Sequence, residues 1–80
     1  MKQIDGMHMS SVVVEQDAHV LSSAMIMGDL HVRGGARVIV DGMVGGTLIA
    51  EDSTVVLNNM AKRIETRGTG EITGPGMRGN

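Results

Sequence analysis

The chain contains no cysteine, phenylalanine, tyrosine or tryptophan, and only one proline. Without cysteine it forms no disulfides, and most zinc sites are excluded as well. A chain of 80 residues forms at most one small domain, and a domain of that size rarely buries enough apolar surface by itself. Association with other chains, or an unusually regular core, remains as the source of stability.

A strong charge imbalance and long hydrophobic runs are also missing. Seven Lys and Arg stand against nine Asp and Glu, which argues against nucleic acid as the main partner because phosphate binding needs clustered basic residues. No run approaches the roughly 18 to 20 apolar residues that cross a bilayer, and the first residues lack the apolar segment of a signal peptide. We therefore expect a cytoplasmic protein without a membrane span.

What the sequence does contain is a repeat. Cutting the chain before Met7, Met25, Met43, Met60 and Met77 gives segments of 18, 18, 17 and 17 residues. Apolar residues then align in columns, and their spacing by two indicates short β-strands separated by glycine and asparagine turns. One-residue deletions are needed within 50–55 and within 60–64. The predicted columns are Val12, Leu30, Leu48 and Ile64; Val14, Val32, Ala50 and Thr66; Val20, Val38, Val55 and Ile72; and Ile4, Ser22, Val40, Leu57 and Gly74.

A strand-and-turn unit of this length is typical of a β-solenoid, in which each repeat is one coil. We predict an all-β fold, a short single-stranded parallel β-solenoid (β-helix) of about four coils of 17–18 residues over residues 1–74, with a Gly-rich flexible tail over 75–80. A narrow aliphatic interior accounts for the missing aromatic rings. The methionine column is expected to fill a corner with flexible side chains. The fourth coil is the weakest, because Lys62, Thr66 and Gly74 replace apolar residues of earlier coils.

Charge gives a second indication of how the coils align. Glu15, Arg33, Glu51 and Arg67 each follow the second column by one position, with alternating sign. Stacked on the outer face, opposite charges on adjacent strands attract each other, although an exposed pair contributes less than about 1 kcal/mol. This column therefore predicts the same alignment without relying on hydrophobicity.

The string GDLHVRGGARVIVDGMVGGTLIAEDSTVVL resembles the core of the bactofilins, the bacterial polymer-forming cytoskeletal β-helix proteins. The resemblance covers about residues 25–74 and rests on coil length, on Gly-Asp-Leu at 28–30 and on DGMVGGTLIA at 41–50. The chain has fewer coils than a bactofilin core and lacks the polar tails of that family. The resemblance implies no catalysis, no cofactor and contacts made through the solenoid ends.

The three histidines lie in different columns, so we do not expect a metal or catalytic site. His19 is predicted to stack on Arg37, and His31 to lie between Val13 and Ile49. Left-handed hexapeptide acyltransferases also use 18-residue coils, but their substrate loops and extra domains do not fit in 80 residues. No phosphate loop or nucleophile elbow occurs, and the threonines do not align into the array that ice binding needs. We predict no enzymatic activity, no cofactor and no metal.

The sequence therefore predicts a non-enzymatic protein-interaction module. In a first hypothesis the chain self-associates or acts as a scaffold through solenoid ends and faces, because an open strand edge pairs readily with another chain. The product would be a homo-oligomer. The joints would be Ile4, Val12 and Val14 at one end and Ile64 and Ile72 at the other.

In the alternative hypothesis the chain is a small immunity protein, an inhibitor that binds and neutralises a toxin in a hetero-complex. Mild acidity suits a basic toxin such as a nuclease, since complementary charge speeds capture. The candidate contacts are Glu15, Asp17, Asp29, Asp41, Glu51 and Asp52. Partner identity, coil handedness and oligomeric state are left open by the sequence.

Overall fold

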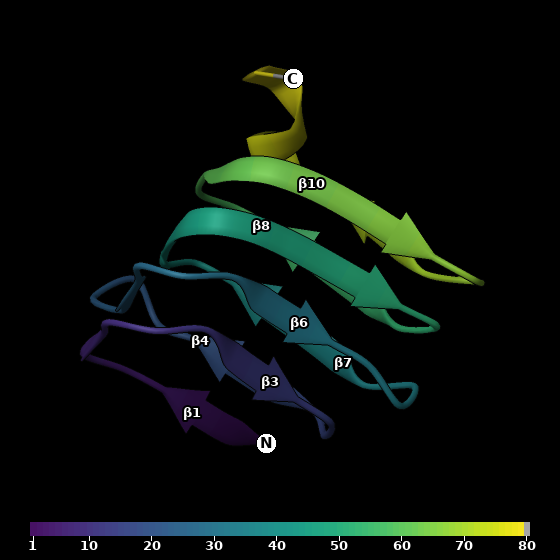
Figure 1. The fold of residues 1–80 in the computed structure, drawn as a ribbon, viewed down its shortest axis with the longest axis horizontal. Helices are drawn as coiled ribbons and strands as arrows, with labels where there is room; N and C mark the ends of the chain where they lie inside the picture. The colour runs from purple at the N-terminus through teal and green to yellow at the C-terminus, as the bar shows by residue number, and fades with distance from the viewer. Residues whose placement is uncertain (80) are drawn as a thin grey trace.

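The computed structural model describes residues 1–79, most of which lie in short strands that stack into coils (Figure 1). All of the strand pairs described are parallel. The elements are β1 (Lys2–Ile4), β2 (Met7–His8), β3 (Val12–Val14), β4 (Ala18–Val20), β5 (Met25–Ile26), β6 (Leu30–Val32), β7 (Arg37–Val40), β8 (Met43–Glu51), β9 (Thr54–Leu57), β10 (Ala61–Arg67), β11 (Glu71–Thr73) and the 3-10 helix η1 (Pro75–Gly79).

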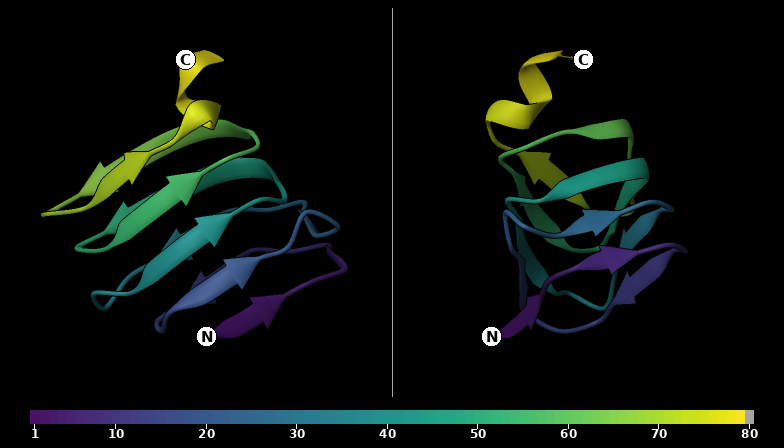
Figure 2. Two further views of the ribbon diagram at one scale, coloured as in Figure 1. Left: turned by 180° about the vertical axis from the view of Figure 1, so that it is seen from behind. Right: turned by 90° about the vertical axis from the view of Figure 1, so that its left-hand side faces the viewer.

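Two parallel sheets form the long sides of every coil. Sheet A has the order β1-β4-β7-β9-β11, and sheet B has the order β2-β5-β8-β6-β3 with β10 paired to β8. In the later coils the two strands of sheet B merge into one long strand, β8 or β10. Figure 2 shows the stack from behind and from the side, with the N terminus at one end and η1 at the other. The predicted parallel β-solenoid of about four coils is confirmed.

Two of the predicted columns form as expected. Leu30 pairs with Leu48 and both are fully buried, while Val12 and Ile64 continue their column at either side. The second column, from Val14 through Val32 and Ala50 to Thr66, is also in register. Residues directly opposite on adjacent strands lie about 5 Å apart, so each side chain packs against its equivalent in the next coil. The predicted one-residue deletions in the third and fourth coils agree with these pairings.

The other two predicted columns are wrong where they join the first coil to the second. Val20 pairs with Val40, and not with Val38 as predicted. Ser22 lies in a turn outside the strands, so the residue of the first coil that belongs between Ile4 and Val40 is Val20. From the second coil onward the predicted alignment holds, since Val38 pairs with Val55 and Val55 with Ile72 in sheet A.

The cause of this error is a pair of compensating differences in corner length. The corner 21–24 of the first coil has four residues, whereas the equivalent corner of the second coil, 41–42, has two. On the opposite side, five residues separate Val32 from Val38, whereas three separate the paired residues Val14 and Ala18 of the first coil. The longer corner includes the glycine pair 34–35, whose φ angles of 74° and 75° suit glycine. Because the two differences cancel, the repeat before and after these corners keeps its period of 18 residues. Between the corners, β4 is paired two residues further along β7 than that period predicts.

The interior of the solenoid is aliphatic, and the methionine column lies outside it. Met7, Met25 and Met43 are in register as predicted, and the carbonyl of Met60 accepts a hydrogen bond from the N–H of Val44, the residue after Met43. The buried core consists of Ile4, Val14, Ala18, Val20, Ala24, Ile26, Leu30, Val32, Ala36, Val38, Val40, Val44, Leu48, Ala50, Val55, Leu57, Ala61 and Ile72.

The segment after β11 packs onto the last coil. Residues Pro75–Gly79 form η1, which contacts β9 and β11, and the side chain of Met77 packs against the core. The prediction of a flexible tail over 75–80 includes Asn80, which lies outside the described residues, and its mobility stays a prediction. The C-terminal end of the described solenoid is therefore covered in part by its own chain.

Candidate functional site

The first coil presents an open edge of backbone hydrogen-bonding groups. Within residues 1–79, β1 is the outermost strand of sheet A, and β2 and β3 are the two outermost strands of sheet B. Each of these strands pairs on one side only. Unpaired edge groups of this kind form hydrogen bonds readily with a strand of another chain.

The side chains around this edge combine a hollow with an exposed apolar residue. A depression of about 540 Å³ opens between the strands of the first coil, and Lys2, Val12 and Gln16 are among the residues that line it. Val13 is 54% exposed and points away from the core between two inward-facing neighbours. Within β3 there is no charged side chain to discourage pairing.

The residues predicted as joints are mostly part of the core. Ile4, Val14 and Ile72 are at most 7% exposed, and Val12 and Ile64 are partly buried against the core. They lie at opposite ends of the stack, so one molecule does not bring them together (Figures 1 and 2). A partner would meet the backbone edge and the outward residues instead.

Sequence reasoning passed over Val13, the residue most available at this end. The predicted joints are residues of the aligned apolar columns, and the alternate spacing of those columns belongs to side chains that face the interior. The same alternation places the residue between Val12 and Val14 on the outer face, where a valine in an uncharged edge strand is unusual enough to notice. The signal was therefore present in the three consecutive valines.

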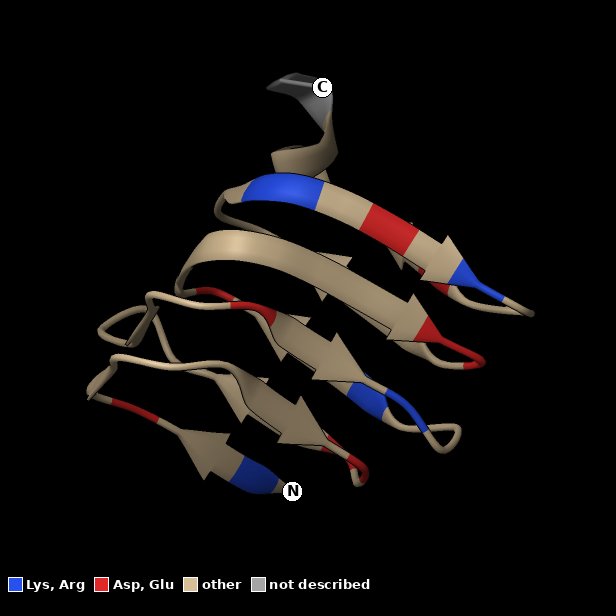
Figure 3. Ribbon diagram, in the orientation of Figure 1, with Lys and Arg blue, Asp and Glu red and all other residues tan. Residues whose placement is uncertain are grey.

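The C-terminal end of the solenoid differs from the first coil in two ways: its edge strand is charged, and a helix packs beside it. The last strand of sheet B, β10, carries Lys62, Arg63, Glu65 and Arg67, and Figure 3 shows its alternating blue and red segments against the uncharged β3. Charged side chains on an edge strand disfavour pairing with another chain. Since η1 also packs beside β9 and β11, this end is less suited to edge pairing than the first coil.

Three of the acidic residues proposed as inhibitor contacts hold neighbouring coils together. In each case one carboxylate oxygen accepts a hydrogen bond from a backbone N–H in the next coil. Asp17 accepts from Arg37 at 2.9 Å, Asp29 from Thr47 at 2.8 Å, and Asp52 from Thr69 at 2.9 Å. These aspartates thereby satisfy backbone donors at the corners, where the strand ladders are interrupted.

A fourth proposed contact, Asp41, lies at the centre of a small polar cluster. Its carboxylate accepts hydrogen bonds from the side-chain amide of Asn58, at 2.8 Å, and from the ring of His19. Its backbone carbonyl accepts another from the amide of Asn59. The bond from Asn58, followed by that from His19, lowers the pKa of Asp41 below its ordinary range. Asp5 has a similar environment, since hydrogen bonds from Ser23 and from the N–H of Gly6 lower its pKa.

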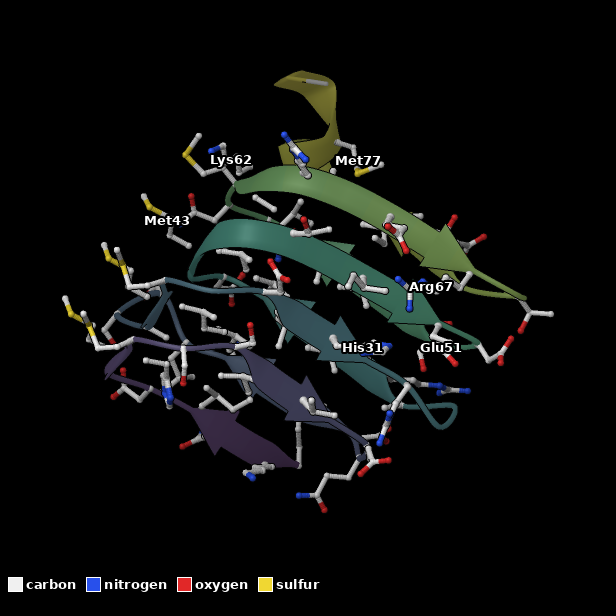
Figure 4. The ribbon with its side chains drawn as sticks, in the orientation of Figure 1. His31, Met43, Glu51, Lys62, Arg67 and Met77 are labelled. Carbon is white, nitrogen blue, oxygen red and sulfur yellow. The ribbon has the colours of Figure 1, made fainter. Side chains whose placement is uncertain are left out.

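The remaining two, Glu15 and Glu51, belong to the predicted ladder of alternating charge. Arg33 donates to Glu15 at 2.9 Å, and Arg67 lies 3.9 Å from Glu51. Glu51 also accepts a hydrogen bond from His31 at 2.8 Å, so Glu51 bridges two coils (Figure 4). The predicted alignment of the column is confirmed, and its carboxylates are engaged within the chain.

The histidines make three separate contacts. His19 lies opposite Ile39 and bonds to Asp41, so the predicted stacking of His19 on Arg37 is wrong, for the same shift of two residues described above. His31 lies between Val13 and Ile49 as predicted. Over residues 1–79, no group of three His, Asp or Glu side chains converges as metal ligands.

Comparison with protein-family models, with curated proteins and with solved structures finds no match for this chain. A search of the described residues for a helix long and apolar enough to cross a membrane finds none. The two ends, the outer faces and the polar contacts of the solenoid are the features that can indicate its function.

Proposed function

We propose that the chain is a non-enzymatic association module that pairs with a second copy of itself through the first coil. The observation that carries this proposal is the asymmetry between the two ends. The first coil offers unpaired strand edges, an exposed Val13 and a hollow of about 540 Å³, whereas the last coil has a charged edge strand and the helix η1.

This asymmetry favours a closed dimer over a filament. If two first coils meet about a two-fold axis, β3 of one copy runs antiparallel to β3 of the other and both edges are satisfied at once. End-to-end stacking of the kind found in a polymer would instead require the first coil of one copy to pair with the last coil of another. Charges along β10 disfavour that contact. The resemblance to bactofilins accordingly supports association through a solenoid end, and polymer formation is not part of the proposal.

The inhibitor hypothesis stays a prediction that no contact in the structure favours. Its six candidate residues all accept hydrogen bonds or form ion pairs inside the chain. A toxin would have to compete with those internal contacts or bind the carboxylates without displacing them. We therefore base the function on the uncovered edge.

Size-exclusion chromatography with light scattering tests the proposal over a series of protein concentrations. We expect the measured mass to rise from that of one chain to that of two. Replacing the exposed valine, Val13→Lys, places a charge in the edge strand and should hold the protein as a monomer. Thr73→Lys, an exposed position in β11 at the other end, is the matched control and should still dimerise. A monomer at every concentration, or an equal effect of both substitutions, would contradict the proposal.

A further inference from the structure

Methionine dominates the exposed apolar surface of this solenoid. The large hydrophobic side chains that stand out of the described surface are Met1, Met7, Met9, Val13, Met27, Met43 and Met60. Apart from Val13, every one of them is a methionine. Sulfur atoms gather along the edge of the molecule where Met43 is labelled in Figure 4. This edge is the corner at which sheet B begins in each coil.

Four of the methionines form a compact group on the first two coils, which we call the methionine quartet: Met7, Met9, Met25 and Met27. Met7 pairs directly with Met25. The N–H of Met27 donates to the carbonyl of His8, so the residues that follow β2 and β5, Met9 and Met27, leave the two strands side by side. Met9 and Met27 directly follow β2 and β5, and like Met7 they are exposed, while Met25 is half-buried and Ile26 is fully buried. The exposure of these residues places the four methionines on the outer side of the solenoid.

Spacing within the quartet suits a single small ligand. Adjacent strands are about 4.8 Å apart and alternate residues of one strand about 7 Å apart. Methionine has an unbranched side chain with three rotatable bonds, so the four sulfurs can converge over the centre of this rectangle. Met43 continues one side of the group in the third coil.

The choice of residue indicates that sulfur matters at these positions, and not only apolar area. Inside the solenoid one column contains Val12, Leu30, Leu48 and Ile64, so aliphatic residues replace one another freely. On the outer side of the first two coils, by contrast, positions 7, 9, 25 and 27 are all methionine. A surface that required only hydrophobic contact would tolerate the same variation as the interior.

We propose that the methionine quartet binds a soft monovalent metal ion, Cu(I) in the first place, through its thioether sulfurs. Thioether ligands favour Cu(I) over the harder divalent ions, because soft donors match a soft, polarisable acceptor. The ligands are neutral, so the site carries no charge that would attract divalent cations. Lys62 lies beyond Met43, next to the far end of the column (Figure 4).

Binding can be measured on the intact chain with two probes. Ag(I), added as the nitrate in chloride-free buffer, is a redox-inert substitute for Cu(I). Cu(I) itself is kept reduced with ascorbate under anaerobic conditions and titrated in competition with a colorimetric Cu(I) chelator. We expect one equivalent of either ion to bind, and Zn(II) not to bind.

The matched variants replace methionine by leucine, which conserves volume and apolar area. In the quartet variant, Met7→Leu, Met9→Leu, Met25→Leu and Met27→Leu are combined, and affinity should fall at least about tenfold, equivalent to 1.4 kcal/mol. In the control, Met60→Leu and Met77→Leu are combined, and affinity should not change. Circular dichroism and thermal melting of both variants check that the solenoid is retained.

A measurement on the unmodified protein gives the same answer without relying on folded variants. With 13C label on the methyl groups of the eight methionines, Ag(I) should shift the four quartet resonances and leave those of Met60 and Met77 in place. Equal affinity of the quartet variant and the wild type would overturn the proposal. Failure of either ion to bind at one equivalent would also overturn it, and the methionine quartet would then be an apolar surface without a metal site.

Discussion

The carboxylate of Asp29 accepts a hydrogen bond from the backbone N–H of Thr47, 18 residues later in the chain, at 2.8 Å. The backbone N–H of Asp29 in turn donates a hydrogen bond to the hydroxyl of Ser11 in the preceding coil, at 3.1 Å. One residue therefore connects three successive coils. Corner residues of this kind hold the coils in alignment where the β-ladders are interrupted.

Removing this connection should destabilise the solenoid by a small, measurable amount. Asp29→Ala leaves the N–H of Thr47 without its acceptor, and we expect the free energy of unfolding to fall by about 1 kcal/mol. Asp29→Asn keeps a side-chain oxygen at the same place and should lose less. Urea unfolding followed by circular dichroism measures both. If the two substitutions had equal effects, the hydrogen bond would not be the source of the stabilisation.

A second prediction concerns the close packing of corners along the stack. A β-carbon at Gly42 would lie 2.6 Å from the carbonyl oxygens of both Leu21 and Ala24, so no side chain fits there. We expect Gly42→Ala to cost about 1–3 kcal/mol, as overpacking does. The control is Gly35→Asn, since nothing lies within 4 Å of that position and asparagine tolerates its φ of 75°. Thermal unfolding should separate the two variants clearly, and similar melting temperatures would count against the packing described here.

The polar cluster at Asp41 gives a prediction about pH. Its folded-state pKa is lowered by the hydrogen bonds from Asn58 and His19, so ionised Asp41 adds stability above the pKa of the unfolded chain. That contribution is lost as the pH falls through the folded-state pKa. Wild type should therefore melt at a higher temperature than Asp41→Asn at pH 6 to 7, and the difference should close below about pH 4. A difference that persists unchanged at acidic pH would show that charge on Asp41 is not involved.

The charge ladder allows a test of the stacking that depends on salt. Arg33→Glu combined with Arg67→Glu places four acids in one column, where Glu15 and Glu51 already lie. We expect a lower melting temperature at low ionic strength that recovers in part when salt is added, because salt screens exposed charges. Arg33→Gln with Arg67→Gln removes the attraction without adding repulsion and should lie between. An unchanged melting temperature at low salt would argue against direct stacking of these residues.

Much of this fold could be predicted from the sequence because stacked coils repeat the same environment. The column of Leu30 and Leu48 was found from spacing alone, since each coil places an aliphatic residue at the same inward position. The ladder of Glu15 and Arg33 was found because adjacent strands bring opposite charges together. Both columns lie in the strands of sheet B. Changes in the length of the turns outside those strands leave their alignment intact.

Other features depended on turn conformation or on side-chain direction, which the repeat does not report. The pairing of Val20 with Val40 was missed because two corner differences cancelled within one period. Asp29 and Asp52 are predicted from the sequence as contacts for a partner, although each bonds to the backbone of the next coil. The outward direction of Met7 and its neighbours follows from the corner geometry, which determines whether a residue lines the interior or the surface.

Site-specific crosslinking tests the central claim, that two chains join through their first coils, most directly. The chain has no cysteine, so Val13→Cys and Thr73→Cys each introduce a unique thiol at one end of the stack. With a short bismaleimide we expect a covalent dimer from Val13→Cys, none from Thr73→Cys, and no mixed product when the two variants are combined. A mixed product as the main species would mean that first coils meet last coils, and would contradict the account.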